Sequence, residues 1–261
     1  MTALALTDRD ALYGAVQFWK GAKDAGIRPV FGVDAGMEDG SRLTLLARND
    51  EGWRSLCRIV TAARANRPKG TALTSWNTIE EYNAGLIALS GGAEGRVARL
   101  LAAGDRAGAS REGARLTELF GGDFHIEIQR RLIPREDAIA AALYSFARAE
   151  GRPAVATNGA VLARAGDKRV HDVLTCVRHH TTLADAGTRL LPSSEFRLKS
   201  AAEMYALFPR APELLEASVA IAARCDVPLD RVALRLADAA DRRHPEPVSY
   251  THLTLPTSDL V

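Results

Sequence analysis

The sequence predicts an α/β fold whose parallel sheet is closed, or nearly closed, into a barrel. Short apolar segments alternate with segments of helical periodicity along most of the chain, as in repeated strand–helix units. The clearest unit is Leu4–Gly32, a predicted strand, helix and second strand. Because functional groups lie at the carboxyl ends of such strands, we expect a site around Thr7–Arg9 and Gly32–Asp34.

The first unit has recognisable boundaries. Ala3–Thr7 is short and apolar, which predicts a strand buried on both faces. Asp8 or Asp10 is expected to cap the following helix, and Gly26 to end it. The side of this helix that should face the core carries apolar residues at helical spacing: Leu12, Val16 and Trp19.

The middle of the chain continues the alternation. Arg42–Arg48 is predicted to be a strand that pairs with the preceding one across a turn at Glu38–Gly40. Further strands are predicted at Gly85–Ser90, Phe124–Gln129 and Pro153–Thr157, with helices at Thr74–Tyr82, Asp105–Phe120 and Pro134–Glu150 and another beginning at Asp50. Gly91-Gly92 is expected to form a tight turn, and His125 to lie on the surface.

The last part of the chain is predicted to be mostly helical. A helix should follow Asp167 and run through His171 and Val177. Ser200 and Glu203 have the spacing of a capping box, and Glu213–Arg224 is a further amphipathic helix. We expect one domain over 1–247, with 181–247 mostly helical, and a non-native tail at 248–261 that resembles a translated sequencing adapter.

Composition excludes several classes of protein. The formal net charge is +2, so total charge gives no sign of nucleic-acid binding. Three widely spaced cysteines, Cys57, Cys176 and Cys225, lack metal-ligand spacing and indicate packed thiols in a reducing compartment. No secretory signal and no long apolar run is visible, so we expect a cytoplasmic protein that does not contact membranes.

A series of motifs in fixed order resembles a known family. It begins with Leu6-Thr7-Asp8-Arg9 and Leu12-Tyr13-Gly14-Ala15-Val16, and continues with Ala22–Ile27, Pro29–Gly32 and the later HDVLTCVR and LKSAAEMYALF segments. These resemble the PHP (polymerase and histidinol phosphatase) domain of bacterial C-family DNA polymerases, over about Leu4 to Leu229. The resemblance implies a distorted (β/α)7 barrel that lacks its first strand–helix unit, truncated at both ends relative to the family.

An intact PHP site binds several divalent metals and hydrolyses phosphoesters. In this chain the family's ligand positions carry other residues: Arg9 and Arg131 replace histidines, and Asp34 replaces a glutamate. In the family's Thr-Asn-Asp-Val-His segment this chain has Thr157-Asn158-Gly159-Ala160-Val161, so both ligands of that segment are missing. Arginine keeps its proton and cannot bind a metal. The resemblance therefore implies a degenerate site without metal or catalysis, whose remnants are Asp8, Arg9, Asp34, Glu127, Arg131 and Asn158 and whose arginines pair with the carboxylates.

The resemblance implies that the parent protein is a DNA-directed DNA polymerase in replication or lesion bypass, using magnesium in a palm domain absent from this chain. This domain would act as a scaffold for the polymerase core and accessory subunits, and would meet DNA only through the parent.

Three alternatives stay open. They are a stand-alone PHP phosphoesterase, a non-catalytic interaction module, and direct nucleic-acid binding through Arg64, Arg67, Lys69, Arg130 and Arg131. An HD-type phosphohydrolase built on His171-Asp172 is disfavoured, because the histidines His179 and His180 are not at ligand spacing.

Overall fold

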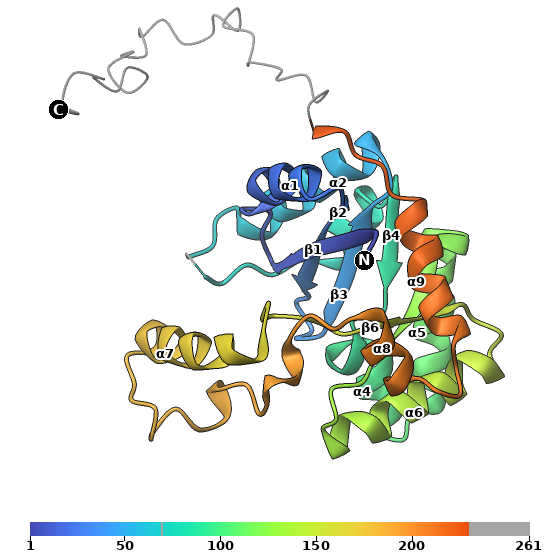
Figure 1. The fold of residues 1–261 in the computed structure, drawn as a ribbon. Coiled ribbons are helices and arrows are strands. Elements are labelled where there is room, and N and C mark those ends of the chain that lie inside the picture. The colour runs from blue at the N-terminus through green and yellow to red at the C-terminus, as the bar shows by residue number, and fades with distance from the viewer. Residues whose placement is uncertain (69, 230–261) are drawn as a thin grey trace, which may run out of the picture. The chain divides into compact units, whose positions relative to one another are not determined.

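The computed structural model describes residues 1–68 and 70–229 (Figure 1). Within them six strands form one sheet in chain order: β1 (Ala3–Arg9), β2 (Arg28–Gly36), β3 (Arg42–Ala47), β4 (Leu86–Leu89), β5 (Phe124–Gln129) and β6 (Ala154–Thr157). The helices of this region are α1 (Ala15–Asp24), α2 (Asp50–Arg64), α3 (Trp76–Glu81), α4 (Arg96–Ala102), α5 (Arg106–Phe120), α6 (Pro134–Ala149), α7 (Lys168–His179), α8 (Ala201–Leu207) and α9 (Glu213–Ala223). The predicted alternation of strands and helices is confirmed.

The sheet is mixed rather than wholly parallel. β1 pairs parallel with β2, and β4, β5 and β6 are parallel neighbours, but β3 is antiparallel to both β2 and β4. The hairpin from β2 to β3 is the one predicted, and Gly40 supplies the positive φ of +80° that its turn requires. An entirely parallel sheet was therefore a wrong expectation, since a short hairpin cannot return the chain in the same direction.

The sheet curls into half of a barrel. Of the described strands, β1 and β6 are the two ends of the order, and no register joins them. A groove of about 530 Å³ lies between their edges, lined mainly by apolar side chains such as Leu4, Leu46 and Val155. The helix α9 packs against β6 and, less extensively, against β1. The α/β barrel architecture is thus present, as an open half-barrel.

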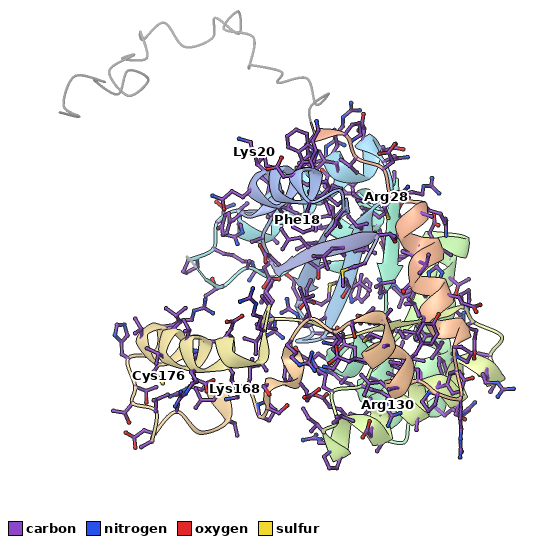
Figure 2. All side chains as sticks on the ribbon, viewed as in Figure 1. Phe18, Lys20, Arg28, Arg130, Lys168 and Cys176 are labelled. Carbon is purple, nitrogen blue, oxygen red and sulfur yellow. The ribbon has the colours of Figure 1, made fainter. Side chains whose placement is uncertain are left out.

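The core lies between the sheet and its covering helices. Val33, Leu45, Ile87 and Ile126 are fully buried on the strands. From the helices, α2 contributes Leu56 and Ile59, and α6 contributes Leu143 and Phe146. Phe31 of β2 meets Phe18 of α1 edge to face, with ring centroids 6.1 Å apart (Figure 2). These contacts are the usual way in which amphipathic helices bury their apolar side on a sheet.

Several local predictions in the first unit were wrong. Every residue of β1 is partly or fully exposed, because it is an end strand with the open groove beside it. Gly14 occupies the cap position of α1 without a side-chain bond, and Val16 is 58% exposed. Asp10 has a φ of 54°, and its Oδ1 accepts the Gly36 N–H at 2.6 Å instead of capping the helix.

The C-terminal elements follow their local signals. Ser200 and Glu203 form the predicted capping box at the start of α8. Leu214 and Leu215 of α9 are buried, but Val219, predicted to face inward, is 64% exposed. Cys176 and Cys225 are buried and Cys57 is half-buried. The predicted boundary at 247 and the tail at 248–261 lie outside the described residues.

Candidate functional site

Charged side chains from three strands meet where β1 and β2 end. The register places Arg9 opposite Asp34, so these two predicted site residues lie side by side. Arg9 Nε is 3.6 Å from Asp34 Oδ2, and Arg9 Nη2 donates to Glu94 Oε1 at 3.0 Å. Arg42, the first residue of β3, places its Nε 2.8 Å from Asp34 Oδ2 and its Nη2 3.6 Å from Asp10 Oδ1. We call Arg9, Asp10, Asp34, Arg42 and Glu94 the strand-end cluster.

The electrostatics of this cluster favour ion pairs. Burial raises the pKa of the Asp34 carboxyl, although Arg42 and Arg9 pull it down. Burial alone would lower the pKa of Arg42, but the nearby carboxylates, Asp34 foremost, outweigh it and raise the pKa. Arg42 therefore stays charged and also donates to the main-chain carbonyl of Asp34. The most buried carboxylate of the cluster is held between two guanidinium groups.

Glu127 is buried in a separate polar network on β5. Its side chain accepts hydrogen bonds from Thr157 at 2.5 Å, Gln129 at 2.9 Å and Thr44 at 3.4 Å. Burial raises the pKa of Glu127, and the negative charge of Asp34 raises it further. The three hydrogen bonds lower this pKa but do not outweigh the burial. All its side-chain partners are neutral, so the predicted pairing of Glu127 with an arginine was wrong.

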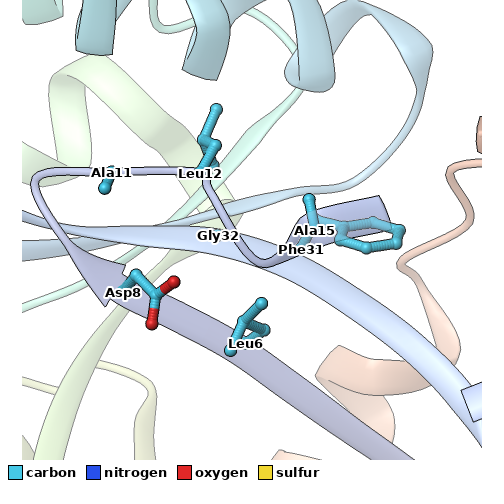
Figure 3. A pocket seen from close by; sticks show the side chains of 7 residues that line it. All are labelled: Leu6, Asp8, Ala11, Leu12, Ala15, Phe31 and Gly32. Atoms are coloured by element: carbon cyan, nitrogen blue, oxygen red, sulfur yellow. The ribbon is translucent and has the colours of Figure 1, made fainter. Parts of the chain in front are cut away.

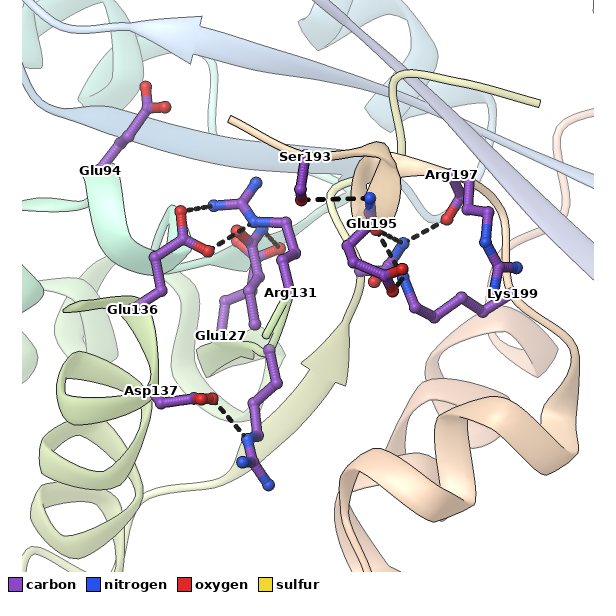
Figure 4. Close-up of polar contacts among 12 residues, drawn as sticks. Glu94, Glu127, Arg131, Glu136, Asp137, Ser193, Glu195, Arg197 and Lys199 are labelled. Carbon is purple, nitrogen blue, oxygen red and sulfur yellow. Dashed lines mark hydrogen bonds and ion pairs between the residues drawn. The ribbon is translucent and has the colours of Figure 1, made fainter. Parts of the chain in front are cut away.

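Arg131 forms its ion pair with Glu136, which lies beside its guanidinium in Figure 4. Its Nε and Nη2 each donate to one carboxylate oxygen of Glu136 at 2.8 Å. Its guanidinium carbon lies 4.2 Å from the centre of the Phe196 ring. The predicted ion pairs of Arg131 with Asp8, Asp34 or Glu127 are therefore replaced by a bidentate pair with the first turn of α6 and a cation–π contact.

The loop after β6 is also used structurally. The Asn158 amide donates to the carbonyls of Arg197 at 2.5 Å and Glu195 at 3.4 Å, which fastens this loop to the segment before α8. Gly159 has a φ of 53°, and a Cβ there would lie 3.1–3.2 Å from Gln129 and Arg131. Side chains therefore already fill the space next to these positions.

Asp8 stands apart from the strand-end cluster. No described side chain forms a hydrogen bond or ion pair with its carboxylate, so neither expected role, helix cap or partner of Arg9, is observed. Asp8 lines a small pocket with Leu6, Leu12 and Phe31 (Figure 3). This pocket is too small to hold a ligand.

Some members of these networks carry a signal in the sequence and others do not. Arg9 and Asp34 were predicted and lie together, whereas Arg42, Glu94 and Glu136 were missed. Arg42 had a usable signal, because a cation that opens a hairpin strand faces the end of the strand before it. His125, predicted to be exposed, is only 8% exposed, and burial lowers its pKa.

The donor set does not fit the metal centre of an intact PHP site. Arg9 cannot act as a ligand, and Asp34 is shared between Arg9 and Arg42. Across residues 1–68 and 70–229, no three His, Cys, Asp or Glu side chains are grouped so that they could hold a metal ion. No helix of this region is long and apolar enough to cross a membrane.

Comparison with known proteins gives consistent relatives. The family model for the PHP domain matches residues 1–131. The DNA polymerase III subunit alpha of Caulobacter vibrioides is 35% identical over 240 residues, which is 86% of this chain and 21% of that protein. The corresponding subunit of Borreliella burgdorferi is 31% identical over 87% of this chain and 21% of its own length. An error-prone DNA polymerase of Symbiobacterium thermophilum is 33% identical over 97% of this chain and 25% of its own length.

The chain thus spans about a fifth to a quarter of the length of these relatives. Its half-barrel fold and the match over residues 1–131 agree with each other and with the motif order in the sequence. The region that it shares with both kinds of bacterial polymerase carries the same domain. The chain belongs to the PHP domain family.

Proposed function

We propose that this chain is the PHP domain of a bacterial C-family DNA polymerase and that it acts there as a scaffold without phosphoesterase activity. The homology to both DNA polymerase III subunit alpha and error-prone DNA polymerase supports the parent activity, DNA-templated DNA synthesis. The observation that carries the scaffold role is the pairing of Asp34 with Arg42 and Arg9 at the strand ends.

This pairing makes metal binding at the strand-end cluster energetically unfavourable. A divalent cation entering the cluster would have to displace Arg42, whose guanidinium is largely buried and has no other carboxylate as close as Asp34. Like charges at such separations repel strongly in a partly buried site. Breaking the pair would also leave the largely buried guanidinium with only the more distant Asp10 as an ionic partner, which is costly. The ion pairs therefore favour structural stability over metal binding.

A stand-alone phosphoesterase is the second candidate function. It would need a metal-activated water and a phosphate-binding centre. Glu127, the deepest carboxylate of the region, has its oxygens occupied by hydrogen bonds from Thr157, Gln129 and Thr44. Because these hydrogen bonds use the lone pairs of the Glu127 carboxylate, they argue against Glu127 as a metal ligand.

Direct DNA binding by the basic residues is weakened by their contacts. Arg67 pairs with Glu38 at 2.9 Å, Arg130 with Asp137 at 2.9 Å and Arg131 with Glu136. Arg64 donates to the carbonyl of Asp10 at 2.8 Å. Lys69 lies outside the described residues. Of the suspected phosphate contacts, the described ones are therefore engaged within the domain.

The experiment compares phosphate release and primer extension. The chain is assayed with p-nitrophenyl phosphate and Mn²⁺ or Zn²⁺, and the full-length protein encoded by the source gene is assayed on a primed DNA template with Mg²⁺. We expect no metal-dependent phosphate release and template-dependent extension. Metal-stimulated hydrolysis that is abolished by Asp34→Asn would favour the phosphoesterase, and a full-length protein that extends no primer would contradict the polymerase assignment.

A further inference from the structure

Helix α7 presents an apolar stripe to solvent. Its exposed apolar side chains, spaced as neighbours on one helix face, are Val170, Val173, Leu174 and Val177, with exposures of 62%, 50%, 62% and 65%. We call these four residues the α7 stripe. No side chain of residues 1–68 or 70–229 covers the stripe to the degree that core residues are covered.

The opposite side of α7 is polar and faces the protein. Lys168, His171, Asp172 and Thr175 are partly buried, and Cys176 is 6% exposed (Figure 2 labels Lys168 and Cys176). Lys168 Nζ donates to Asp172 Oδ2 at 2.6 Å, so a charged pair lies on the sheltered side. This arrangement is the reverse of an ordinary surface helix, which buries its apolar side. The reversal indicates that a further surface covers the stripe.

The small area of the α7 stripe and the basic residues beside it limit what could cover it. Specific interfaces between separate proteins bury roughly 800 Å² per partner, far more than four aliphatic side chains on one helix supply. A covalently attached segment can use a smaller interface, because the tether gives a high effective concentration. Exposed basic residues, Arg169 and Arg178, flank the stripe, so a second copy of the chain would bring like charges together.

We propose that the α7 stripe is the docking surface for the polymerase part of the parent chain, through an apolar patch rimmed by acidic side chains. This inference rests on the proposed function. The length of the relatives supports it. The chain spans only 21% of the alpha subunits that it resembles, so most of such a polypeptide would lie outside the described region and could cover the stripe.

The test is site-specific thiol labelling in the chain and in the full-length protein. Val173→Cys is introduced into both, with Gln17→Cys on the exposed side of α1 as the matched control. Each protein is treated with a maleimide, and labelling at the two positions is quantified by peptide mass spectrometry. We expect the rate at position 173, relative to position 17, to fall by about tenfold or more in the full-length protein, because a docked interface opens only rarely.

A second variant tests the apolar cause. Adding Val177→Glu to the full-length Val173→Cys protein should restore fast labelling, because burying a carboxylate in an apolar interface is unfavourable. Equal relative labelling of the chain and the full-length protein would overturn the inference. Labelling in the isolated chain that slows with increasing protein concentration would identify a second copy as the occupant and would also overturn it.

Primer extension by the same full-length protein separates this inference from the proposed function. Extension together with an unprotected position 173 refutes the docking surface and leaves the polymerase assignment intact. Protection without extension refutes the polymerase assignment, and with it the proposed occupant. A source gene that encodes no polymerase region has the same consequence.

Discussion

Helices α2 and α7 are both amphipathic, but they turn their apolar sides in opposite directions. In α2 the apolar side, Leu56, Ile59 and Ala63, packs into the core, and charged residues face outward. In α7 the apolar side is the exposed one. The comparison shows that sequence periodicity predicts an amphipathic helix. It does not predict which side of the helix is buried, because that depends on the rest of the polypeptide.

The contrast is limited to the apolar side chains, because buried polar groups behave alike in both regions. In the half-barrel, Arg42 and Glu127 find their partners within the chain. Beneath α7, the Nδ1 of His171 and one carboxylate oxygen of Asp172 are buried without a hydrogen-bond partner among the described residues. Buried polar atoms without such a partner also occur in the half-barrel, for example Trp76 Nε1 and His125 Nδ1, so this feature does not separate the two regions.

The largest expected effect comes from truncating matched leucines. Leu56→Ala should lower the free energy of unfolding by about 3 kcal/mol, because it leaves a cavity in the core. Leu174→Ala in α7 should change it by less than about 0.5 kcal/mol, because the side chain is already exposed. Urea denaturation of both variants measures the difference. A cost for Leu174→Ala close to that for Leu56→Ala would remove the contrast between the helices.

An intermediate effect is expected from the arginines of the strand-end cluster. Arg42→Met should cost about 2 kcal/mol at neutral pH, because it leaves the half-buried Asp34 with only the exposed Arg9 as an ionic partner. Arg9→Met is the matched control and should cost less than about 0.5 kcal/mol, because the Arg9 side chain is 64% exposed.

The pH dependence of Arg42→Met follows from the sign of the Asp34 shift. Burial raises the pKa of Asp34, and removing Arg42 raises it further. The protonated form stabilises the fold below the pKa of the unfolded chain, and this contribution is lost as the pH rises. The deficit of the variant should therefore be small near about pH 4 and grow toward neutral pH. A deficit that shrinks with rising pH would show that Asp34 is not the group that loses its main partner.

The smallest expected effect is a gain of stability. Burial raises the pKa of Glu127, so its ionised form opposes folding once the pH exceeds that raised value. Glu127→Gln should raise the free energy of unfolding by about 1 kcal/mol at pH 8, and the gain should vanish below about pH 4. Thermal melting across this pH range is the measurement. A wild-type protein that is more stable than the variant at pH 8 would mean that the hydrogen bonds accepted by the ionised carboxylate outweigh the cost of its burial.

Features with local causes were predictable from the sequence. The hairpin at Gly40, the capping box at Ser200 and the extent of α5 and α6 depend on residues close in the chain, and each was predicted. The exposure of β1 was not predictable, since it depends on which strands stand next to it. The predictions that Val16 and Val219 face the core were wrong for the same reason.

The candidate site was predictable only in part. Arg9 and Asp34 were found together because parallel neighbouring strands bring their ends to one edge. The partners of Arg131 and Glu127 were not, because Glu136, Thr44 and Thr157 come from separate elements and carry no distinctive sequence signal. The antiparallel β3, which brings in Arg42, was predicted as a strand but not as part of the site.

The central claim is that arginine ion pairs occupy the place of a metal centre. Isothermal titration calorimetry with Mn²⁺ and Zn²⁺ tests it most directly, with the wild-type chain and an Asp34→Asn control measured under the same conditions. The account predicts no stoichiometric binding to the wild-type chain. Stoichiometric binding with a micromolar Kd that is lost in Asp34→Asn would contradict it, and would restore the strand-end cluster as a metal site.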